Sequence, residues 1–302
     1  MTDVTQAVPL DYPSEDDLQF LPEGPVEISE CQFSWVAIQH SSTATTGSLC
    51  EFDLANQQNT RYDLEGRPGF AFRQADGSYV IGLERSLIRF DPTSKRSTTL
   101  ADGIDADVEN TIINDGLQIG DDFVFGCKDL EFATKKAGLY LFRSGDSQLI
   151  RLRSDRICSN GKVVVEEGGE LRLYDIDSPA RTVWSYKLDI AAGQITDEKV
   201  EFDLTSESAV PDGMTITPDG KHLIIAMFQP EKVSDGQTRM YDRQSGELVK
   251  VWETIGSRQN TCPAIIHFEG QTRVLITTAS EHMDDADREM CPMAGRFFLA
   301  DL

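Results

Sequence analysis

The sequence has no long apolar run and few positive charges. No apolar stretch in its 302 residues approaches the ~20 residues that a membrane-spanning helix requires. Its 28 Lys and Arg residues stand against 51 Asp and Glu residues, and the resulting formal charge of −23 repels nucleic acid and anionic membrane surfaces. The start, MTDVTQAVPLDYPSEDD, lacks the basic and apolar regions of a secretory signal. We therefore expect a cytoplasmic monomer or weak homo-oligomer without nucleic-acid or membrane partners.

Motifs that rely on cysteine, serine or histidine are also missing. The six cysteines lie far apart, and no CxxC pair suggests a zinc or redox site, so we expect reduced structural residues. The chain has no GxSxG nucleophile elbow. Its four histidines share no spacing typical of a metal site or a catalytic triad. These absences leave Asp, Glu and Asn side chains as candidates for chemistry.

Glycines recur at a regular spacing and open short apolar runs such as PEGPVEI, INDGLQI and VPDGMTI. Their spacings are 45, 47, 45, 52 and 51 residues along the chain. The runs between them are short or alternate with period 2, which is typical of strands, and no long amphipathic helix is evident. About 45 to 50 residues with three or four strands form one propeller blade. The sequence thus predicts an all-β, six-bladed β-propeller with a central channel. The register positions are Gly24, Gly69, Gly116, Gly161, Gly213 and, in NTCPAII, Ala264.

Two further expectations concern domain organisation and core. We expect residues 1–16 to form a flexible extension and residues 17–302 to form a single propeller domain. A strand near residues 18–21 is predicted to complete the last blade and to tie the ends of the ring together. Three tryptophans are predicted to pack between blades rather than to bind a ligand. They are Trp35, Trp184 and Trp252.

The residue before each register position would line the channel, because equivalent positions at the start of innermost strands form a ring. Four of the six residues offer side-chain oxygens, which suit Ca²⁺, Mg²⁺ or Mn²⁺ rather than a structural zinc site. Asp-Gly and Asn-Gly are also common turn dipeptides, so a turn alone explains any one of them. Their common register, together with Glu23, which is not a turn former, favours a site. The six residues are Glu23, Pro68, Asp115, Asn160, Asp212 and Pro263.

The motifs LPEGPVE, INDGLQ, CSNGK, VPDGMTITPDG and LITTAS, in this order, resemble one family of six-bladed propellers. It is the senescence marker protein, gluconolactonase and luciferin-regenerating (regucalcin-like) family, and the resemblance covers about residues 20–302. It implies one divalent cation, Ca²⁺ before Zn²⁺, Mn²⁺ or Mg²⁺, with waters completing its shell. It also implies a carboxylate that doubles as general base. The implied residues are Glu23, Asn160 and Asp212 for the metal, Asp212 for the base, and Asn114 and Glu131 for the substrate. Asp115 is expected to support these residues without touching the metal or the substrate itself.

The function implied is a divalent-metal-dependent lactonase that opens a small lactone or ester with activated water. A calcium-binding propeller without turnover and a protein-interaction scaffold are the alternatives. The chain departs from sugar-lactone hydrolases of this family, which often carry an arginine where this sequence has Ile112. Ile112 therefore predicts a weaker preference for polyhydroxylated substrates. Lys128 and Asp129 are polar residues nearby, and either are solvated loop residues or replace the missing substrate contact.

Overall fold

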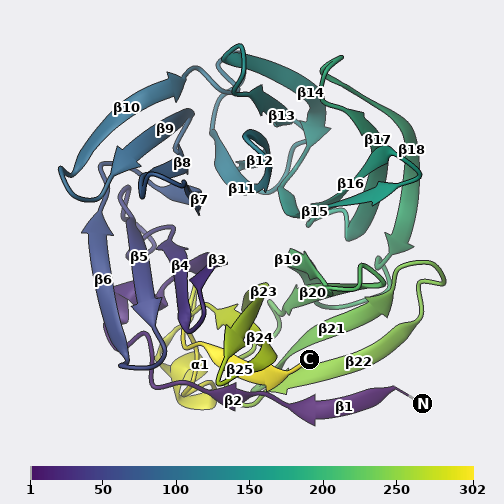
Figure 1. Ribbon diagram of the computed structural model, residues 1–302. Helices are drawn as coiled ribbons and strands as arrows, with labels where there is room; N and C mark the ends of the chain where they lie inside the picture. The colour runs from purple at the N-terminus through teal and green to yellow at the C-terminus, as the bar shows by residue number, and fades with distance from the viewer. Residues whose placement is uncertain (1) are drawn as a thin grey trace. The chain divides into compact units, whose positions relative to one another are not determined.

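The computed structural model describes residues 2–302 and consists almost wholly of β-strands (Figure 1). The strands form six sheets, and the strands of each sheet are nearly consecutive in the chain. We number these blades 1 to 6 in chain order. Each register position predicted from the glycine spacing lies on the first strand of its blade. The predicted fold class, an all-β six-bladed β-propeller, is confirmed.

The chain divides into two compact units. The first unit comprises the chain up to Ala71 together with Ser208–Leu302, and the second unit is Phe72–Glu207. Blades 1, 5 and 6 belong to the first unit. Blades 3 and 4 lie within the second unit, and blade 2 lies there except for the start of its first strand.

Antiparallel pairing builds the blades of the first unit. Two short helices accompany the strands: η1 (Asp16–Gln19) precedes blade 1, and α1 (Asp285–Met290) lies within blade 6. Blade 1 contains β3 (Pro22–Ser29), β4 (Gln32–Ala37), β5 (Ser48–Asp53) and β6 (Gln58–Asp63). Blade 5 contains β19 (Val210–Ile216), β20 (His222–Phe228), β21 (Gly236–Asp242) and β22 (Leu248–Thr254). Blade 6 contains β23 (Asn260–Phe268), β24 (Gln271–Thr278) and β25 (Phe298–Asp301).

The remaining three blades are four-stranded sheets. Blade 2 contains β7 (Pro68–Arg73), β8 (Tyr79–Leu83), β9 (Ser86–Asp91) and β10 (Arg96–Ala101). Blade 3 contains β11 (Thr111–Ile119), β12 (Asp122–Asp129), β13 (Ala137–Arg143) and β14 (Gln148–Arg156). Blade 4 contains β15 (Ser159–Glu167), β16 (Glu170–Asp177), β17 (Thr182–Asp189) and β18 (Gln194–Asp203).

The N-terminal segment pairs with two blades, although the sequence predicted a flexible extension there. Strand β1 (Asp3–Gln6) adds to β22 in parallel, and β2 (Val8–Pro9) adds to β25 in antiparallel. Without these strands, the N–H and C=O groups along those sheet edges would lack partners. The strand predicted near residues 18–21 is wrong, because η1 occupies that position and β2 joins the last blade instead. A single domain over residues 17–302 stays a prediction.

Aromatic side chains fill the core, as predicted for the tryptophans. Trp35 and Trp252 have no exposed surface. Trp35 packs edge-to-face on Phe297 of blade 6, with ring centroids 5.0 Å apart. Trp184 packs against an apolar cluster shared by blades 3 and 4. Within residues 2–302, no helix is long and apolar enough to cross a membrane.

Candidate functional site

A β-bulge interrupts the first strand of five blades at or beside the predicted register position. A bulge takes a residue out of the hydrogen-bond ladder and re-aims its side chain, and bulges are over-represented next to active sites. The glycine register of the sequence therefore coincides with a repeated irregularity of the backbone. The shifts lie between Glu23 and Val26, Ile113 and Gly116, Asn160 and Lys162, Pro211 and Met214, and Asn260 and Pro263.

Three of the predicted site residues make the same local hydrogen bond. In each case a side-chain oxygen accepts a bond from the backbone N–H of the following glycine. The bond turns the side chain back towards its own bulge and fixes the position of one oxygen. The donors and acceptors are Gly24 N–H to Glu23 Oε2 at 3.0 Å, Gly116 N–H to Asp115 Oδ1 at 2.7 Å, and Gly161 N–H to Asn160 Oδ1 at 3.1 Å.

In the first unit, Glu23 and Asp212 lie on the two strands that flank β23 (Figure 1). The Thr261 hydroxyl of β23 donates to the Pro22 carbonyl of β3, next to Glu23, at 2.7 Å. On its other side, β23 packs tightly against β19. A Cβ on the glycine after Asp212 would lie 2.6 Å from the Cys262 sulfur. Any larger residue there would force the two strands apart, so the packing holds the strands that carry Glu23 and Asp212 on either side of β23.

In the second unit, Asn114 and Asn160 meet around one sulfur. Asn114 is 6% exposed, and its Nδ2 donates to the Ser159 carbonyl at 3.2 Å and to Cys158 Sγ at 3.5 Å. Asn160 is 5% exposed and directs its own Nδ2 towards the same sulfur at 4.0 Å. Because the NH₂ groups are committed to these acceptors, the amide oxygens are the atoms that each residue can offer to a ligand.

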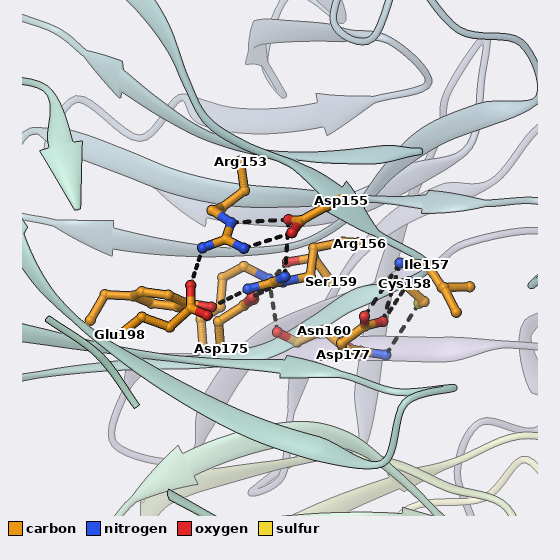
Figure 2. Close-up of polar contacts among 12 residues, drawn as sticks. Arg153, Asp155, Arg156, Ile157, Cys158, Ser159, Asn160, Asp175, Asp177 and Glu198 are labelled. Carbon is orange, nitrogen blue, oxygen red and sulfur yellow. Dashed lines mark hydrogen bonds and ion pairs between the residues drawn. The ribbon is translucent and has the colours of Figure 1, made fainter. Parts of the chain in front are cut away.

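A buried ion network supports the segment that carries Asn160 (Figure 2). The Asp175 carboxylate has no exposed surface and accepts from Arg156 Nε at 3.1 Å and from Ser159 Oγ at 2.6 Å. Lys162 Nζ lies 3.4 Å from the same carboxylate and donates to the Asn160 carbonyl at 2.8 Å. The network therefore fixes the bulge at Asn160 in two ways. Lys162 binds the Asn160 carbonyl, and Asp175 binds the hydroxyl of the preceding Ser159.

Two more carboxyls adjoin this network, and both have raised pKa values. Burial raises the pKa of Asp115, and the nearby Lys162 ammonium and the Gly116 N–H oppose that rise. Burial also raises the pKa of Asp177, which accepts from the backbone N–H of Cys158 at 3.1 Å. We did not predict Lys162, Asp175 or Asp177 from the sequence, although a lysine inside the apolar run GKVVV was a visible signal.

Glu131 lies in an exposed turn just after β12. Its Oε1 accepts from Asn110 Nδ2 at 3.3 Å. Within residues 2–302, no hydrogen bond or ion pair joins Glu131 to Asn114. Its role as a substrate contact therefore stays a prediction.

Lys128 and Asp129 are not the solvated loop residues that one alternative predicted. They end β12 and are 8% and 0% exposed. Asp129 also cannot replace a substrate contact, because its carboxylate is fully used within the protein. It pairs with Lys136 at 3.0 Å and folds the following turn back onto the strand. Its backbone donors are the N–H groups of Glu131, Ala133 and Thr134.

The Asp129 turn predicts an acid-sensitive contribution to stability. Burial alone would raise the pKa of Asp129, but hydrogen bonds from Thr134, Lys136 and neighbouring N–H groups outweigh it and lower the pKa to about 2 from 3.8. A carboxylate whose pKa is lower in the folded than in the unfolded protein stabilises the fold fully at pH values above its pKa in the unfolded chain. This stabilisation is lost as the pH falls from about 4 towards 2. We expect Asp129→Asn to lower the free energy of unfolding by about 1–3 kcal/mol at pH 7.

Urea denaturation at pH 7 and at pH 3 would measure this difference. Glu131→Gln in the same turn is the matched control, because its side chain is exposed. It should change stability by less than about 0.5 kcal/mol. An Asp129→Asn effect that equals the control, or that does not shrink in acid, would contradict the role of this carboxylate.

The family profile described as SMP-30/Gluconolactonase/LRE-like region matches residues 21–280. The chain belongs to this family. Regucalcin of Gallus gallus is 23% identical over 261 residues, which cover 84% of this chain and 83% of that protein. A candidate sugar lactone lactonase of Bacillus subtilis, YvrE, is 28% identical over 177 residues. That match covers 59% of this chain and 57% of YvrE, so the chain spans little more than half the length of this relative.

Solved structures of SMP-30/gluconolactonase/LRE-like proteins share the fold. A regucalcin from Agrobacterium tumefaciens, described as a calcium-binding protein, superposes with a TM-score of 0.84 at 22% identity, covering 99% of this chain and 95% of its own. A gluconolactonase from Xanthomonas campestris gives a TM-score of 0.64 at 14% identity, with coverages of 94% and 87%. At these identities the likeness supports the architecture alone.

The donor chemistry of the predicted metal ligands suits a hard divalent cation. Within residues 2–302, no group of three or more His, Cys, Asp or Glu side chains is placed to hold a metal. The predicted set is of another kind, since it combines the two carboxylates Glu23 and Asp212 of the first unit with the amide of Asn160 of the second. All three offer oxygen, which Ca²⁺, Mg²⁺ and Mn²⁺ prefer. Glu23 and Asn160 each have one oxygen fixed by a glycine N–H.

Proposed function

We propose that this member of the SMP-30/gluconolactonase/LRE-like family is a divalent-metal-dependent lactonase that opens a small lactone or ester. The observation that carries the proposal is the repeated bulge, which sets Glu23, Asn160 and Asp212 at the same register position of three blades. Family membership supports the reaction class, since one relative is a candidate sugar lactone lactonase and one structural neighbour a gluconolactonase.

Glu23, Asn160 and Asp212 would hold the cation, which is Ca²⁺ in the first instance. The calcium-binding description of the Agrobacterium regucalcin supports this choice, and Mg²⁺, Mn²⁺ and Zn²⁺ are the other candidates. A divalent cation in this place supplies Lewis acidity for a lactone carbonyl and makes bound water more acidic. Two carboxylates and one neutral amide leave the protein ligands with a charge of about −2, which matches such an ion.

The chain's own residues would position the substrate and move the proton. Asp212 accepts the proton of the attacking water, since a carboxylate within hydrogen-bond reach is an effective general base. The close packing of the next residue on Cys262 restricts the backbone that carries Asp212. Asn114 offers its Oδ1 to a substrate hydroxyl, because its Nδ2 is bound to Ser159. Asp115 lies in the same bulge and supports Asn114. Glu131 is the second proposed substrate contact.

Metal removal tests the proposal. Lactonase activity on glucono-1,5-lactone and on simple aliphatic lactones is expected to fall at least 100-fold after treatment with a chelator and dialysis. One equivalent of Ca²⁺, Mg²⁺, Mn²⁺ or Zn²⁺ should restore it, because the cation supplies the electrophile. The assay follows acid release at constant pH, with metal binding measured in parallel by calorimetry.

Full activity in metal-free protein would contradict the metal role. Stoichiometric Ca²⁺ binding without hydrolysis of any lactone would favour the second candidate function, a calcium-binding propeller without turnover. The regucalcin names among the relatives give that candidate its support.

A further inference from the structure

Lys128 is a nearly buried cation, and within residues 2–302 no carboxylate forms an ion pair with it. The residue is 8% exposed. Within the part of the chain that the structure describes, its ammonium forms no ion pair and no hydrogen bond, and it lies 5.9 Å from the centroid of the Phe132 ring. An unpaired charge in a buried place is strongly unfavourable. Lys162 in the next blade is 3% exposed and has Asp175 at 3.4 Å.

The strand pairing sets Lys128 beside the proposed substrate residue Asn114. In blade 3, Lys128 pairs with Ile112 of β11, two residues before Asn114. It also forms a bridge with Cys158, whose sulfur accepts from Asn114 Nδ2 at 3.5 Å. Directly opposed residues of neighbouring strands project to the same face of a sheet. Lys128 therefore shares a face of the blade 3 sheet with Ile112.

Asp129 and Asp115, which follow Lys128 and Asn114 directly in the sequence, are bound to other groups. Asp129 is held by its own turn and by Lys136. Asp115 accepts from Gly116 and has Lys162 as its neighbouring cation. Neither carboxylate pairs with Lys128, so an anionic group on a ligand would supply the partner that these two residues do not.

We propose that Lys128 binds an anionic oxygen group, a carboxylate or a phosphate, on the lactone that this protein hydrolyses. The inference rests on the proposed lactonase function and names its substrate class, an acidic lactone. An ammonium forms a short, charge-assisted hydrogen bond with either group. The formal charge of −23 repels anions at long range, so an uncompensated local cation is what retains such a substrate.

Matched pairs of lactones test the substrate class. The neutral glucono-1,5-lactone is compared with 6-phosphoglucono-1,5-lactone, and the neutral glucono-1,4-lactone with glucaro-1,4-lactone, which carries a free carboxylate. In the wild-type protein, kcat/KM should favour the anionic member of at least one pair about tenfold or more, and the larger ratio identifies the group. Lys128→Met should lower that ratio about 10- to 100-fold, and Lys128→Arg should keep most of it.

Lys187→Met is the matched control. Lys187 is an exposed lysine of the neighbouring blade that pairs with Glu170, and its loss should leave the ratio unchanged. A ratio near one in the wild-type protein, or one that Lys128→Met does not change, would overturn the assignment even where neutral lactones are hydrolysed.

A binding measurement separates this inference from the proposed function. Metal-free protein is titrated calorimetrically with inorganic phosphate and with glucarate, so that neither turnover nor a cation contributes. Lys128→Met should weaken binding of at least one anion about tenfold or more, with a circular dichroism spectrum like that of the wild type. If that variant does not fold, Lys128→Gln takes its place. Absence of all lactone hydrolysis would end the proposed function, and equal anion affinities of wild type and variant would end the role of Lys128.

Discussion

Asp212→Asn is expected to lower kcat for lactone hydrolysis by about 100- to 10,000-fold, the range that a general base contributes. Asparagine has the shape of aspartate and keeps one side-chain oxygen, but it cannot take a proton from water. It also fits the backbone between Pro211 and Gly213, so the packing of β19 on β23 should persist. The measurement is kcat at saturating metal, with metal affinity and thermal stability determined on the same sample.

Asp219→Asn is the matched control for this change. Asp219 is an aspartate at the other end of β19, in the turn before β20, where it accepts from the Thr217 hydroxyl at 2.7 Å. Its replacement should leave kcat within about twofold, because the turn has no part in the reaction. Full activity of Asp212→Asn would remove this carboxylate from the mechanism. Equal losses in both variants would indicate a general disturbance of blade 5.

The blades could be predicted from the sequence because a glycine or alanine recurs at a regular spacing on the first strand of each blade. In four blades a glycine follows an acidic or amide residue at the register position, and in each of these four blades the strand pairing shifts there. Gly24, for example, has a φ of +53°, which a residue with a Cβ rarely adopts. The period is therefore visible in the letters before any pairing is known.

The N-terminal strands could not be found in this way. Strands β1 and β2 contain four and two residues, too few for a period to show. Their pairing depends on the open edges of β22 and β25, which lie more than 240 residues further along the chain. Such strands are specified by tertiary contacts rather than by their own sequence.

The pairing of Lys162 with Asp175 in the buried ion network could have been predicted from the sequence. The pair Gly168–Gly169 is a two-residue hairpin turn, which fixes the register of the flanking strands. Counting outward from the pair Glu167 and Glu170 sets Lys162 opposite Asp175, and the structure shows that pairing. The burial of Lys128 could not have been predicted in this way, since its pairing partners Ile112 and Cys158 belong to other segments of the chain.

Asp175→Asn should cause a large loss of stability. Two cations, Arg156 and Lys162, are each 3% exposed and share this carboxylate. Removing one member of a buried ion group leaves its partners charged and desolvated, and we expect the free energy of unfolding to fall by about 3–5 kcal/mol. Urea denaturation followed by tryptophan fluorescence measures the change. Glu170→Gln in the exposed pair with Lys187 is the control and should cost less than about 1 kcal/mol.

A second substitution separates the missing charge from other effects of the change. In the double variant Asp175→Asn, Lys162→Met, one of the two buried cations that lost the Asp175 carboxylate is removed, and the buried volume is nearly kept. It should therefore unfold with a free energy about 1–3 kcal/mol higher than Asp175→Asn alone. The same double variant lacks the bond from Lys162 to the Asn160 carbonyl, so it should bind the metal more weakly although it is the more stable of the two. Recovery of stability together with metal affinity would show that the network supports the fold of blade 4 and not the position of Asn160.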